Sequence, residues 1–364
     1  MTTSPPWHGA GNKVGLDAMS SHPERIDVRS PSEYALDHLP GAINLPVLDD
    51  DERRVVGTMQ AQESAFAARR FGAALVARNI ANIVETHCRE QPRDWAPIVY
   101  CWRGGKRSAS LAHVLNQIGW RAVQLDGGYR TWRRHVVAAL TSLPNRFTYR
   151  VVCGLTGSGK SRLLGALREE GAQVLDLERL ARHRGSLLGD LPDGPQPSQK
   201  AFETQLFVAF EGFDPARPVY VESESRKIGA LQVPEALLVA MRTAECIRVD
   251  TPRALRIVLL KDEYAHFVDD PASLHERLQP LVPLLGRKMI ERWRAAGVAG
   301  DFDMLVGELL DSHYDPIYGR SIERNFPNTR NALAVTPDDI STTAFRALAR
   351  TIAAPASATV AVTE

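Results

Sequence analysis

The feature that most constrains the fold of this chain is the run GLTGSGKS at residues 154–161. It matches the P-loop pattern, in which a glycine and four further residues precede Gly-Lys-Ser or Gly-Lys-Thr. The apolar stretch YRVVC comes directly before the run, and SRLLGAL predicts a helix after it. Because such a loop points backbone N–H groups at a chain of phosphates, the sequence predicts an α/β domain that binds a polyphosphate.

The side chains of this loop predict distinct contacts with such a ligand. Lys160 would place its charge on the terminal phosphates, and the Ser161 hydroxyl would be a ligand of Mg²⁺. The other binding candidates are the residues that let the backbone approach the phosphates, namely Gly154, Gly157, Ser158 and Gly159. The pattern indicates polyphosphate binding, and it does not by itself indicate hydrolysis.

An NTPase usually adds an acidic residue near the metal, and the sequence offers two candidates. Glu222 lies in the predicted strand of VYVESES, at a place where NTPases usually have Asp. Asp176 follows the strand predicted in AQVLD. A carboxylate that ends a strand or caps a helix is the alternative interpretation of each residue.

Three weaker stretches also carry residues that could contact a ligand. His183 and Arg184 begin a Gly- and Pro-rich segment that predicts a loop, where they could contact an anion or a nucleotide base. Arg226 follows the acidic strand and could contact phosphate, and a solvated loop is the alternative for all three. Residues 311–321, DSHYDPIYGRS, predict a turn whose aromatic rings and cations would suit an unpaired RNA base, with a packed turn as the alternative.

A second chemical site is predicted in VYCWRGGKRSAS, residues 99–110. Cys101 ends an apolar strand and is followed by a glycine-containing loop and a helix that begins near Ser108. Backbone N–H groups and the helix N-terminus would face the sulfur, and cations follow it at Arg103, Lys106 and Arg107. These effects favour the thiolate over the thiol, so we expect Cys101 to be a nucleophile.

The loop alone leaves the reaction of Cys101 open. The spacing Cys101-x-x-Gly104-x-x-Arg107 also fits cysteine-dependent phosphatases, in which the arginine binds phosphate while the thiolate attacks it. A carrier of sulfur or selenium is the second interpretation. A buried structural cysteine at a strand end is the third.

Two flanking stretches resemble the signatures of rhodanese domains. DVRSPSEYALDHLPGAINLP, residues 27–46, resembles their N-terminal signature, and QLDGGYRTWRR, residues 124–134, resembles their closing signature. The resemblance covers residues 22–140 and implies that Cys101 carries a persulfide or, by analogy, a perselenide. Some phosphatases share the rhodanese fold, so phosphatase chemistry stays an alternative.

The order of apolar segments predicts an α/β fold with two domains. Strands alternate with helices in the first half, which favours a parallel sheet covered by helices. The chain then breaks near LTSLPNRFTYR, and beyond Pro234 the pattern is mostly helical, with the last strand expected in MRTAECIRVD. We therefore expect the following organisation: an N-terminal extension (1–21), a rhodanese-like domain (22–140), a P-loop domain with a helical C-terminal part (147–350) and a disordered tail (351–364).

Composition excludes several classes of protein. The chain has 44 Lys and Arg against 43 Asp and Glu, a formal net charge of +1, so a broadly basic nucleic-acid coat is not expected, although a local patch is compatible with it. Four cysteines form neither a disulfide framework nor a close zinc-binding pair, and we expect them to be reduced. No apolar run approaches the roughly 18 residues of a membrane span, and no secretory segment is evident. We expect a cytoplasmic protein without a membrane partner.

A rhodanese-like domain followed by a P-loop domain resembles the tRNA 2-selenouridine synthase family. The stretches LERLARHRGSLLG, VYVESESRKIG and HYDPIYG resemble segments of that family. The resemblance implies exchange of sulfur for selenium at C2 of the wobble 2-thiouridine of certain tRNAs. It further implies two co-substrates. One is selenophosphate, which a separate synthase supplies, and the other is geranyl diphosphate, which first alkylates the sulfur.

The resemblance also gives each site a role. The P-loop would hold the diphosphate through Lys160, Ser161 and Mg²⁺, while Cys101 would accept selenium and deliver it, with its neighbouring cations holding the donor. The target base, in the tRNA anticodon loop, is accessible without melting a duplex. The alternatives are a P-loop ATPase or kinase with a regulatory rhodanese domain, a sulfur-relay module that binds tRNA, and a thiosulfate sulfurtransferase. A prenyl pocket could involve Phe202, Leu206 and Phe210, for which core packing is the alternative.

Overall fold

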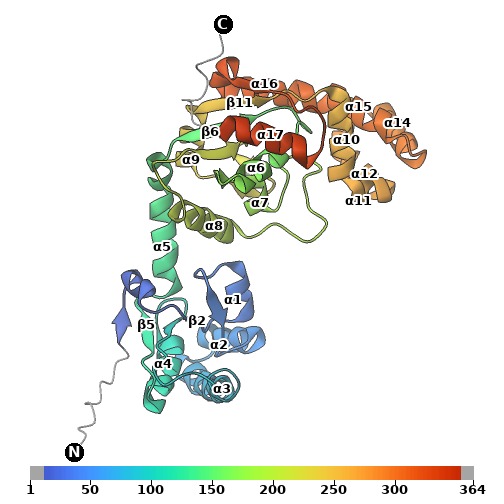
Figure 1. Ribbon diagram of the computed structural model, residues 1–364. Helices are drawn as coiled ribbons and strands as arrows, with labels where there is room; N and C mark the ends of the chain where they lie inside the picture. Colours follow the sequence, from blue (N-terminus) through green and yellow to red (C-terminus); the bar gives the residue numbers. More distant parts are fainter. Residues whose placement is uncertain (1–11, 354–364) are drawn as a thin grey trace, which may run out of the picture. The chain divides into compact units, whose positions relative to one another are not determined.

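Two separate parallel β-sheets organise the chain, one in each of two structural units (Figure 1). The computed structural model describes residues 12–353. The first unit comprises the chain up to Ala139 together with Pro197–Val208, and the second comprises Leu140–Gln196 and the chain from Ala209 onward. The α/β architecture, with an N-terminal parallel-sheet unit and a later unit that ends in helices, agrees with the fold class predicted from the sequence.

The sheet of the first unit has the strand order β1-β5-β4-β2-β3, and all of its strand pairs are parallel. Its strands are β1 (Lys13–Val14), β2 (Arg25–Asp27), β3 (Ala42–Asn44), β4 (Ile98–Tyr100) and β5 (Val123–Leu125). Its helices are α1 (Pro31–Leu36), α2 (Asp50–Gln62), α3 (Ala65–Thr86), α4 (Lys106–Ile118) and α5 (Tyr129–Leu140). The first strand lies within residues 1–21, the segment expected to be an extension.

Local sequence explains where the elements near Cys101 begin and end. Helix α1 starts at a capping box, because Ser30 and Glu33 each bond to the other's backbone N–H, and Pro31 suits the first turn. Helix α4 ends at Gly119, whose φ of +115° is open to glycine. Strand β4 is fully buried, so Cys101 leaves the sheet directly from its core.

Most of helix α8 (Gln199–Glu211) belongs to the first unit, although it follows the P-loop in sequence. The Ser198 hydroxyl, just before this helix, donates to the Leu36 carbonyl, and Thr204 donates to Asp37 at 3.1 Å. Glu203 forms an ion pair with Arg133. A domain boundary placed at one position of the sequence cannot assign α8 to the first unit, because that assignment depends on packing between residues far apart in the chain.

The sheet of the second unit has the order β12-β11-β6-β8-β7 and is also parallel. Its strands are β6 (Tyr149–Cys153), β7 (Gln173–Leu175), β8 (Val219–Glu222), β11 (Glu245–Val249) and β12 (Leu333–Val335), and a separate short hairpin joins β9 (Lys227–Ile228) to β10 (Leu231–Gln232). The prediction that the stretch containing β11 is the last strand is wrong. Two of the three residues of β12 are exposed, so it lacks the apolar run by which a strand is found.

The rest of the second unit is helical. Its further helices are α6 (Lys160–Glu169), α7 (Leu177–Ala181), α9 (Glu235–Arg242), α10 (Arg253–Glu263), α11 (Ala265–Asp269), α12 (Pro271–Leu278), α13 (Val282–Leu285), α14 (Arg287–Val298), α15 (Phe302–Leu309), α16 (Asp315–Asn325) and α17 (Thr342–Ala353). Phe345 and Ala349 of α17 pack with Leu163 and Leu164 of α6 in the sheet core. The helices after β11 form a second core around Trp293, which is fully buried.

The turn predicted at residues 311–321 is wrong, because this segment is helical. Leu310–Tyr314 forms a π-helical turn that runs directly into α16. Pro316 lies in the first turn of α16, where the missing N–H is not needed. Tyr314 is buried, as the alternative of a packed segment predicts.

Both predicted chain ends fall partly beyond the structure. The tail expected at 351–364 lies outside the described residues from position 354 onward, while α17 extends through Ala353. Within residues 12–353, no helix combines the length and the apolar character needed to cross a membrane.

Candidate functional site

Cys101 lies where β4 gives way to a tight loop, and two donors hold its sulfur. The Gly105 N–H donates to Sγ at 3.3 Å, and the Ser108 hydroxyl donates to it at 3.2 Å. The side chain is 4% exposed, and helix α4 begins at Lys106, just beyond the loop. Donors directed at sulfur stabilise negative charge on it during a reaction, so this geometry suits a nucleophile.

The closing segment predicted at residues 124–134 supports this loop from behind. The N–H groups of Tyr129 and Arg130 donate to the carbonyls of Cys101 and Trp102 at 2.9 and 3.0 Å. Gly128 has φ +59°, and a Cβ there would collide with the Cys101 carbonyl. Gly104 has φ +60°, and its Cβ would lie 2.6 Å from a β5 carbonyl. Both glycines are needed because the two loops touch backbone to backbone.

The three cations of the Cys101 loop have different surroundings. Arg107 donates to Glu33 at 2.8 Å, an ion pair that, against the opposing effect of burial, holds the pKa of Glu33 below its usual value. Arg103 and Lys106 are exposed, and neither has an ion-pair partner within residues 12–353. Two positive charges are therefore available to an anion near the sulfur, while the third is fixed by a carboxylate.

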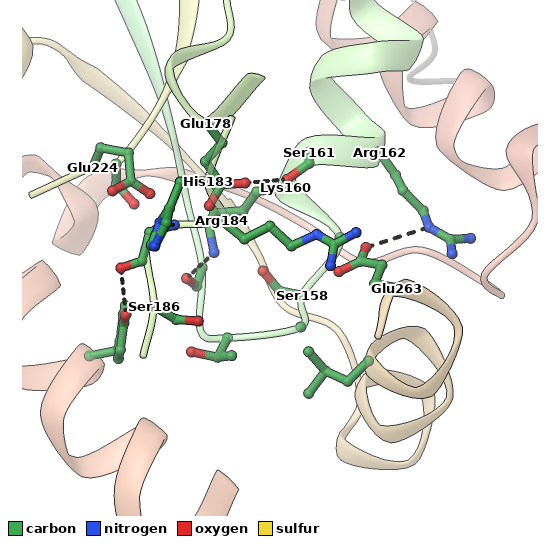
Figure 2. A pocket seen from close by; sticks show the side chains of 18 of the residues that line it. Ser158, Lys160, Ser161, Arg162, Glu178, His183, Arg184, Ser186, Glu224 and Glu263 are labelled. Carbon is green, nitrogen blue, oxygen red and sulfur yellow. Dashed lines mark hydrogen bonds and ion pairs between the residues drawn. The ribbon is translucent and has the colours of Figure 1, made fainter. Parts of the chain in front are cut away.

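The P-loop connects β6 to α6 as predicted, and it borders a pocket of about 470 Å³ (Figure 2). Gly157 and Gly159 have φ values of +74° and +81°, which are open to glycine. Lys160 Nζ donates to the carbonyls of Gly154 and Leu155 at 3.0 and 3.3 Å. Ser158 is buried, and its hydroxyl has no hydrogen-bond partner within the described chain. All six predicted loop residues thus lie around one pocket.

Acidic side chains meet the P-loop serine on one side of this pocket. Ser161 Oγ donates to Glu178 at 3.0 Å, and the Glu178 N–H donates to Glu222 Oε1 at 2.7 Å. Glu222 is 2% exposed, and its Oε2 has no hydrogen-bond partner within residues 12–353. Asp176 lines the pocket, but it caps α7 and pairs with Arg168 at 3.0 Å. The capping alternative therefore describes Asp176, while Glu222 accepts from the Glu178 N–H and does not itself line the pocket.

Burial makes these carboxyl groups hard to ionise. Desolvation, helped by the charge of Glu224, raises the pKa of Glu178 to about 8. Burial followed by the charge of Asp176 raises the pKa of Glu222 well above its usual value, and burial also raises that of Glu224. A bound cation would relieve this repulsion.

The residues present fit a magnesium ion only together with a phosphate ligand. No group of three or more His, Cys, Asp or Glu side chains in the described chain is arranged as a metal cage. Magnesium in phosphate sites commonly takes one or two protein ligands, and phosphates and waters complete its coordination. Ser161 and Glu178, 3.0 Å apart beside the P-loop, are the residues that would hold it.

Family models match both parts of the chain. Residues 15–135 match the family model of the rhodanese-like domain, and residues 147–279 match that of the tRNA 2-selenouridine synthase AAA domain. A tRNA 2-selenouridine synthase from Nitrosomonas europaea is 36% identical over 267 residues, covering 71% of this chain and 68% of the relative. One from Salmonella newport is 33% identical over 334 residues, covering 83% and 90%. The chain belongs to the tRNA 2-selenouridine synthase family.

The resemblance stated from the sequence is thereby confirmed for the family. A solved structure of a rhodanese-related protein from Thermoplasma volcanium is 18% identical to this chain, with a TM-score of 0.22, and the match covers 34% of this chain and 92% of that chain. In this member of the tRNA 2-selenouridine synthase family, the motif residues of both domains lie in the geometries described above.

The loop predicted after α7 brings both of its candidates, His183 and Arg184, to the P-loop pocket. Arg184 lies over the ring of Tyr264, 4.7 Å from its centroid, and its buried Nη1 has no hydrogen-bond partner in the described chain. His183 is 5% exposed and accepts a bond from the Gly185 N–H at 3.0 Å, and burial lowers its pKa. His183 therefore shapes the loop, and Arg184 faces the ligand side. Arg226 is exposed and does not line this pocket.

The three apolar residues considered for a prenyl pocket are core residues. Phe202, Leu206 and Phe210 are at most 1% exposed, as the core-packing alternative predicts. A different apolar cavity adjoins the P-loop pocket, because Leu260 and Tyr264 line both. It lies among α10, α11, α12 and α15 and has almost no polar surface. Its residues are spread over residues 156–314, so no local motif announces it.

Sequence reasoning also missed residues that act on the predicted groups. Gln124 donates to Ser108 Oγ at 2.7 Å, and the serine hydrogen can be donated to the Cys101 sulfur or to the Gly105 carbonyl, each 3.2 Å away. Lys200 from the α8 segment lies 5.4 Å from the ring of Trp102. Glu178 could have been found from the sequence, because it lies two positions after Asp176, where a helix starts directly after a strand. Gln124 and Lys200 had no such signal, because they reach the loop only through tertiary packing.

We predict that Ser108→Ala slows alkylation of Cys101 by iodoacetamide about tenfold at neutral pH. The variant removes a hydrogen bond to a charged group, whose loss is worth roughly 1.5–3 kcal/mol. Ser110→Ala is the matched control, since Ser110 lies on the same helix and donates only to the Lys106 carbonyl. The rate is measured by mass spectrometry of the Cys101 peptide. Equal rates in the two variants would contradict the role of Ser108.

We predict that Glu178→Gln stabilises the protein increasingly as the pH rises. The Glu178 pKa of about 8 lies above its usual 4.5, so between these values the folded state keeps a proton that the unfolded state has lost. The contribution of the protonated Glu178 side chain to stability is complete below about pH 4.5 and is lost as the pH rises toward 8. The difference in Tm between variant and parent should therefore grow up to about pH 8 and then level off. The exposed Glu211→Gln is the control, and a constant difference would contradict this prediction.

Proposed function

We propose that this chain replaces sulfur by selenium in the wobble 2-thiouridine of tRNA, with selenophosphate as donor, through an S-geranyl intermediate formed from geranyl diphosphate. The observation that carries the proposal is a phosphate pocket with an adjoining apolar cavity, in a chain that also holds a nucleophilic thiol. A diphosphate would occupy the P-loop pocket, and the first part of its apolar chain would enter the adjoining cavity, whose volume of about 50 Å³ is smaller than a whole geranyl group. The tRNA would offer the unpaired bases of its anticodon loop, and a separate synthase would supply the selenophosphate.

In the first step, the sulfur of 2-thiouridine attacks C1 of the geranyl group. The C–O bond breaks with its electron pair on diphosphate, and the N3 proton of the base passes to solvent. Lys160, the P-loop N–H groups and Arg184 stabilise the charge that develops on the leaving group. A magnesium ion on Ser161 and Glu178 would neutralise phosphate charge. The step needs no hydrolysis of a nucleotide.

In the second step, hydrogen selenide released from selenophosphate adds to C2, and geranylthiolate leaves with the electron pair of the C–S bond. The phosphoryl group of the donor passes finally to water and leaves as inorganic phosphate. An alkylated sulfur is a better leaving group than a thiocarbonyl, which explains why alkylation comes first. The Cys101 loop, with the exposed charges of Arg103 and Lys106, would act on the anionic selenium donor. We expect the protein to work in the cytoplasm.

The test is mass spectrometry of nucleosides from tRNA treated with the unmutated protein. Geranyl diphosphate alone should yield S-geranyl-2-thiouridine, and addition of selenophosphate should convert it to 2-selenouridine. Nucleotide hydrolysis without tRNA, and no modified base with both donors, would favour the ATPase or kinase alternative. Binding of tRNA with neither modification nor hydrolysis would favour the sulfur-relay alternative.

A further inference from the structure

The loop around Cys101 has the features of a phosphoryl-binding site. Five residues separate Cys101 from Arg107, the spacing at which phosphatases pair a thiolate with a phosphate-binding arginine. Glu33 holds Arg107 through one N–H group at 2.8 Å, and Arg53 lies 3.6 Å from the same carboxylate oxygen. Since a guanidinium has five N–H donors, Arg107 keeps donors for a ligand while its orientation is fixed.

The backbone of this loop offers further donors for phosphoryl oxygens. The N–H groups of Trp102, Arg103 and Gly104 donate to no other described residue, whereas that of Gly105 donates to the sulfur. Gly104 adopts φ +60°, which turns the backbone as anion-binding loops require. The exposed Arg103 and Lys106 add positive charge at the loop. Free N–H groups and cations together suit a phosphoryl dianion more closely than a neutral selenium atom.

The Ser108 hydroxyl, which donates to the Cys101 sulfur, suits a thiolate that must first attack and later act as a leaving group. Gln124 donates to Ser108 at 2.7 Å, and Ser108 donates to Sγ at 3.2 Å. A donor at Sγ stabilises negative charge whenever the sulfur carries it. This includes the moment at which a covalent S–P bond breaks and its electron pair returns to sulfur.

We propose that Cys101 takes the phosphoryl group of selenophosphate and releases its selenium as selenide. This inference rests on the proposed function, because selenophosphate is the donor there. A sulfur lone pair forms the S–P bond, and the P–Se bond breaks with its electron pair on selenium, which leaves as hydrogen selenide with a proton from the donor or from water. Water then attacks phosphorus, the S–P electron pair returns to sulfur, and inorganic phosphate leaves.

Electron counting separates this route from a perselenide on Cys101. In the phosphoryl route selenium stays at the level of selenide and phosphorus at the level of phosphate, so no redox partner is needed. If a selenium atom were instead transferred onto the thiolate, the electron pair of the P–Se bond would stay on phosphorus. The product would then be phosphite, or an oxidant would be required. Hydrogen selenide is also a good leaving group, and its proton comes from the donor or from water, so the route needs no acidic residue beside Sγ.

The test gives the full-length protein selenophosphate alone, without tRNA or geranyl diphosphate. We expect a burst of inorganic phosphate, selenide that is trapped by an alkylating bimane, and a phosphoryl group on the Cys101 peptide after an acid quench. Cys101→Ser should show none of these, and its thermal unfolding should match the parent. A Cys101 peptide with the isotope pattern of selenium and no phosphorus, or phosphite as the product, would overturn the inference.

A second variant keeps the test decisive if Cys101→Ser folds poorly. Ser108→Ala should accumulate the phosphoryl enzyme and release phosphate about tenfold more slowly, because the sulfur loses a donor as it leaves. Ser110→Ala should behave as the parent protein. Orthovanadate, which mimics phosphorus under attack, should protect Cys101 from iodoacetamide, and absence of protection would count against the inference.

The outcomes distinguish this inference from the proposed function. Phosphate and selenide release that depends on Cys101, in a protein that leaves tRNA unmodified, would support the inference while the proposed function fails. Selenated tRNA produced without a phosphoryl enzyme or a phosphate burst would overturn the inference while the proposed function stands.

Discussion

Cys101→Ser is expected to lower selenium incorporation into tRNA at least about a hundredfold, while geranylation proceeds at the parent rate. The thiol belongs to the first unit and the P-loop pocket to the second, so the two half-reactions of the proposed function would use different residues. Serine preserves the size of the side chain but is a much weaker nucleophile at neutral pH. The nucleosides of treated tRNA, separated and weighed by mass spectrometry, should show accumulated S-geranyl-2-thiouridine.

The control for this variant is Cys88→Ala, which removes another buried thiol of the same unit. Cys88 lies in the same hydrophobic core cluster as Cys101, but it is not among the hydrogen-bond donors to the Cys101 sulfur. It should therefore incorporate selenium normally. Normal 2-selenouridine from the Cys101 variant would remove Cys101 from the reaction.

Lys160→Ala is expected to reduce geranylation about 10²–10³-fold, the usual effect of losing one preorganised group that stabilises developing negative charge. Since geranylation comes first, 2-selenouridine should also be lost, and unmodified 2-thiouridine should remain. Lys160 Nζ lies within the P-loop, 3.0 Å from the Gly154 carbonyl, where it faces the pocket that would hold diphosphate. The same nucleoside assay measures both products.

A bypass experiment makes this prediction specific. S-geranylated tRNA prepared with the Cys101→Ser protein should be converted to 2-selenouridine by Lys160→Ala at the parent rate. The exposed Lys288→Ala on α14 is the matched control for loss of a positive charge. If Lys160→Ala fails to use geranylated tRNA, the P-loop would serve the selenium step as well. The assignment of the two steps to separate sites would then be wrong.

The order of strands and helices around both motifs could be predicted from local pattern. The P-loop, the Cys101 loop and the double glycine at 127–128 lie where strands end, because short-range steric and hydrogen-bond requirements determine such turns. Strand β12 and the helix at 311–321 could not be found in this way. One is short and exposed, and the other begins with an Asp-Pro pair that also suits a turn.

The sequence by itself determined the chemistry that each loop could perform, because a thiolate among N–H donors and a lysine in a P-loop depend on adjacent residues. Tertiary structure decided which distant side chains act on them. Gln124 reaches Ser108, Arg184 lies on Tyr264, and α8 packs mostly with the first unit. Such partners are chosen by packing and burial across long sequence separations, and these forces leave no local pattern in the chain.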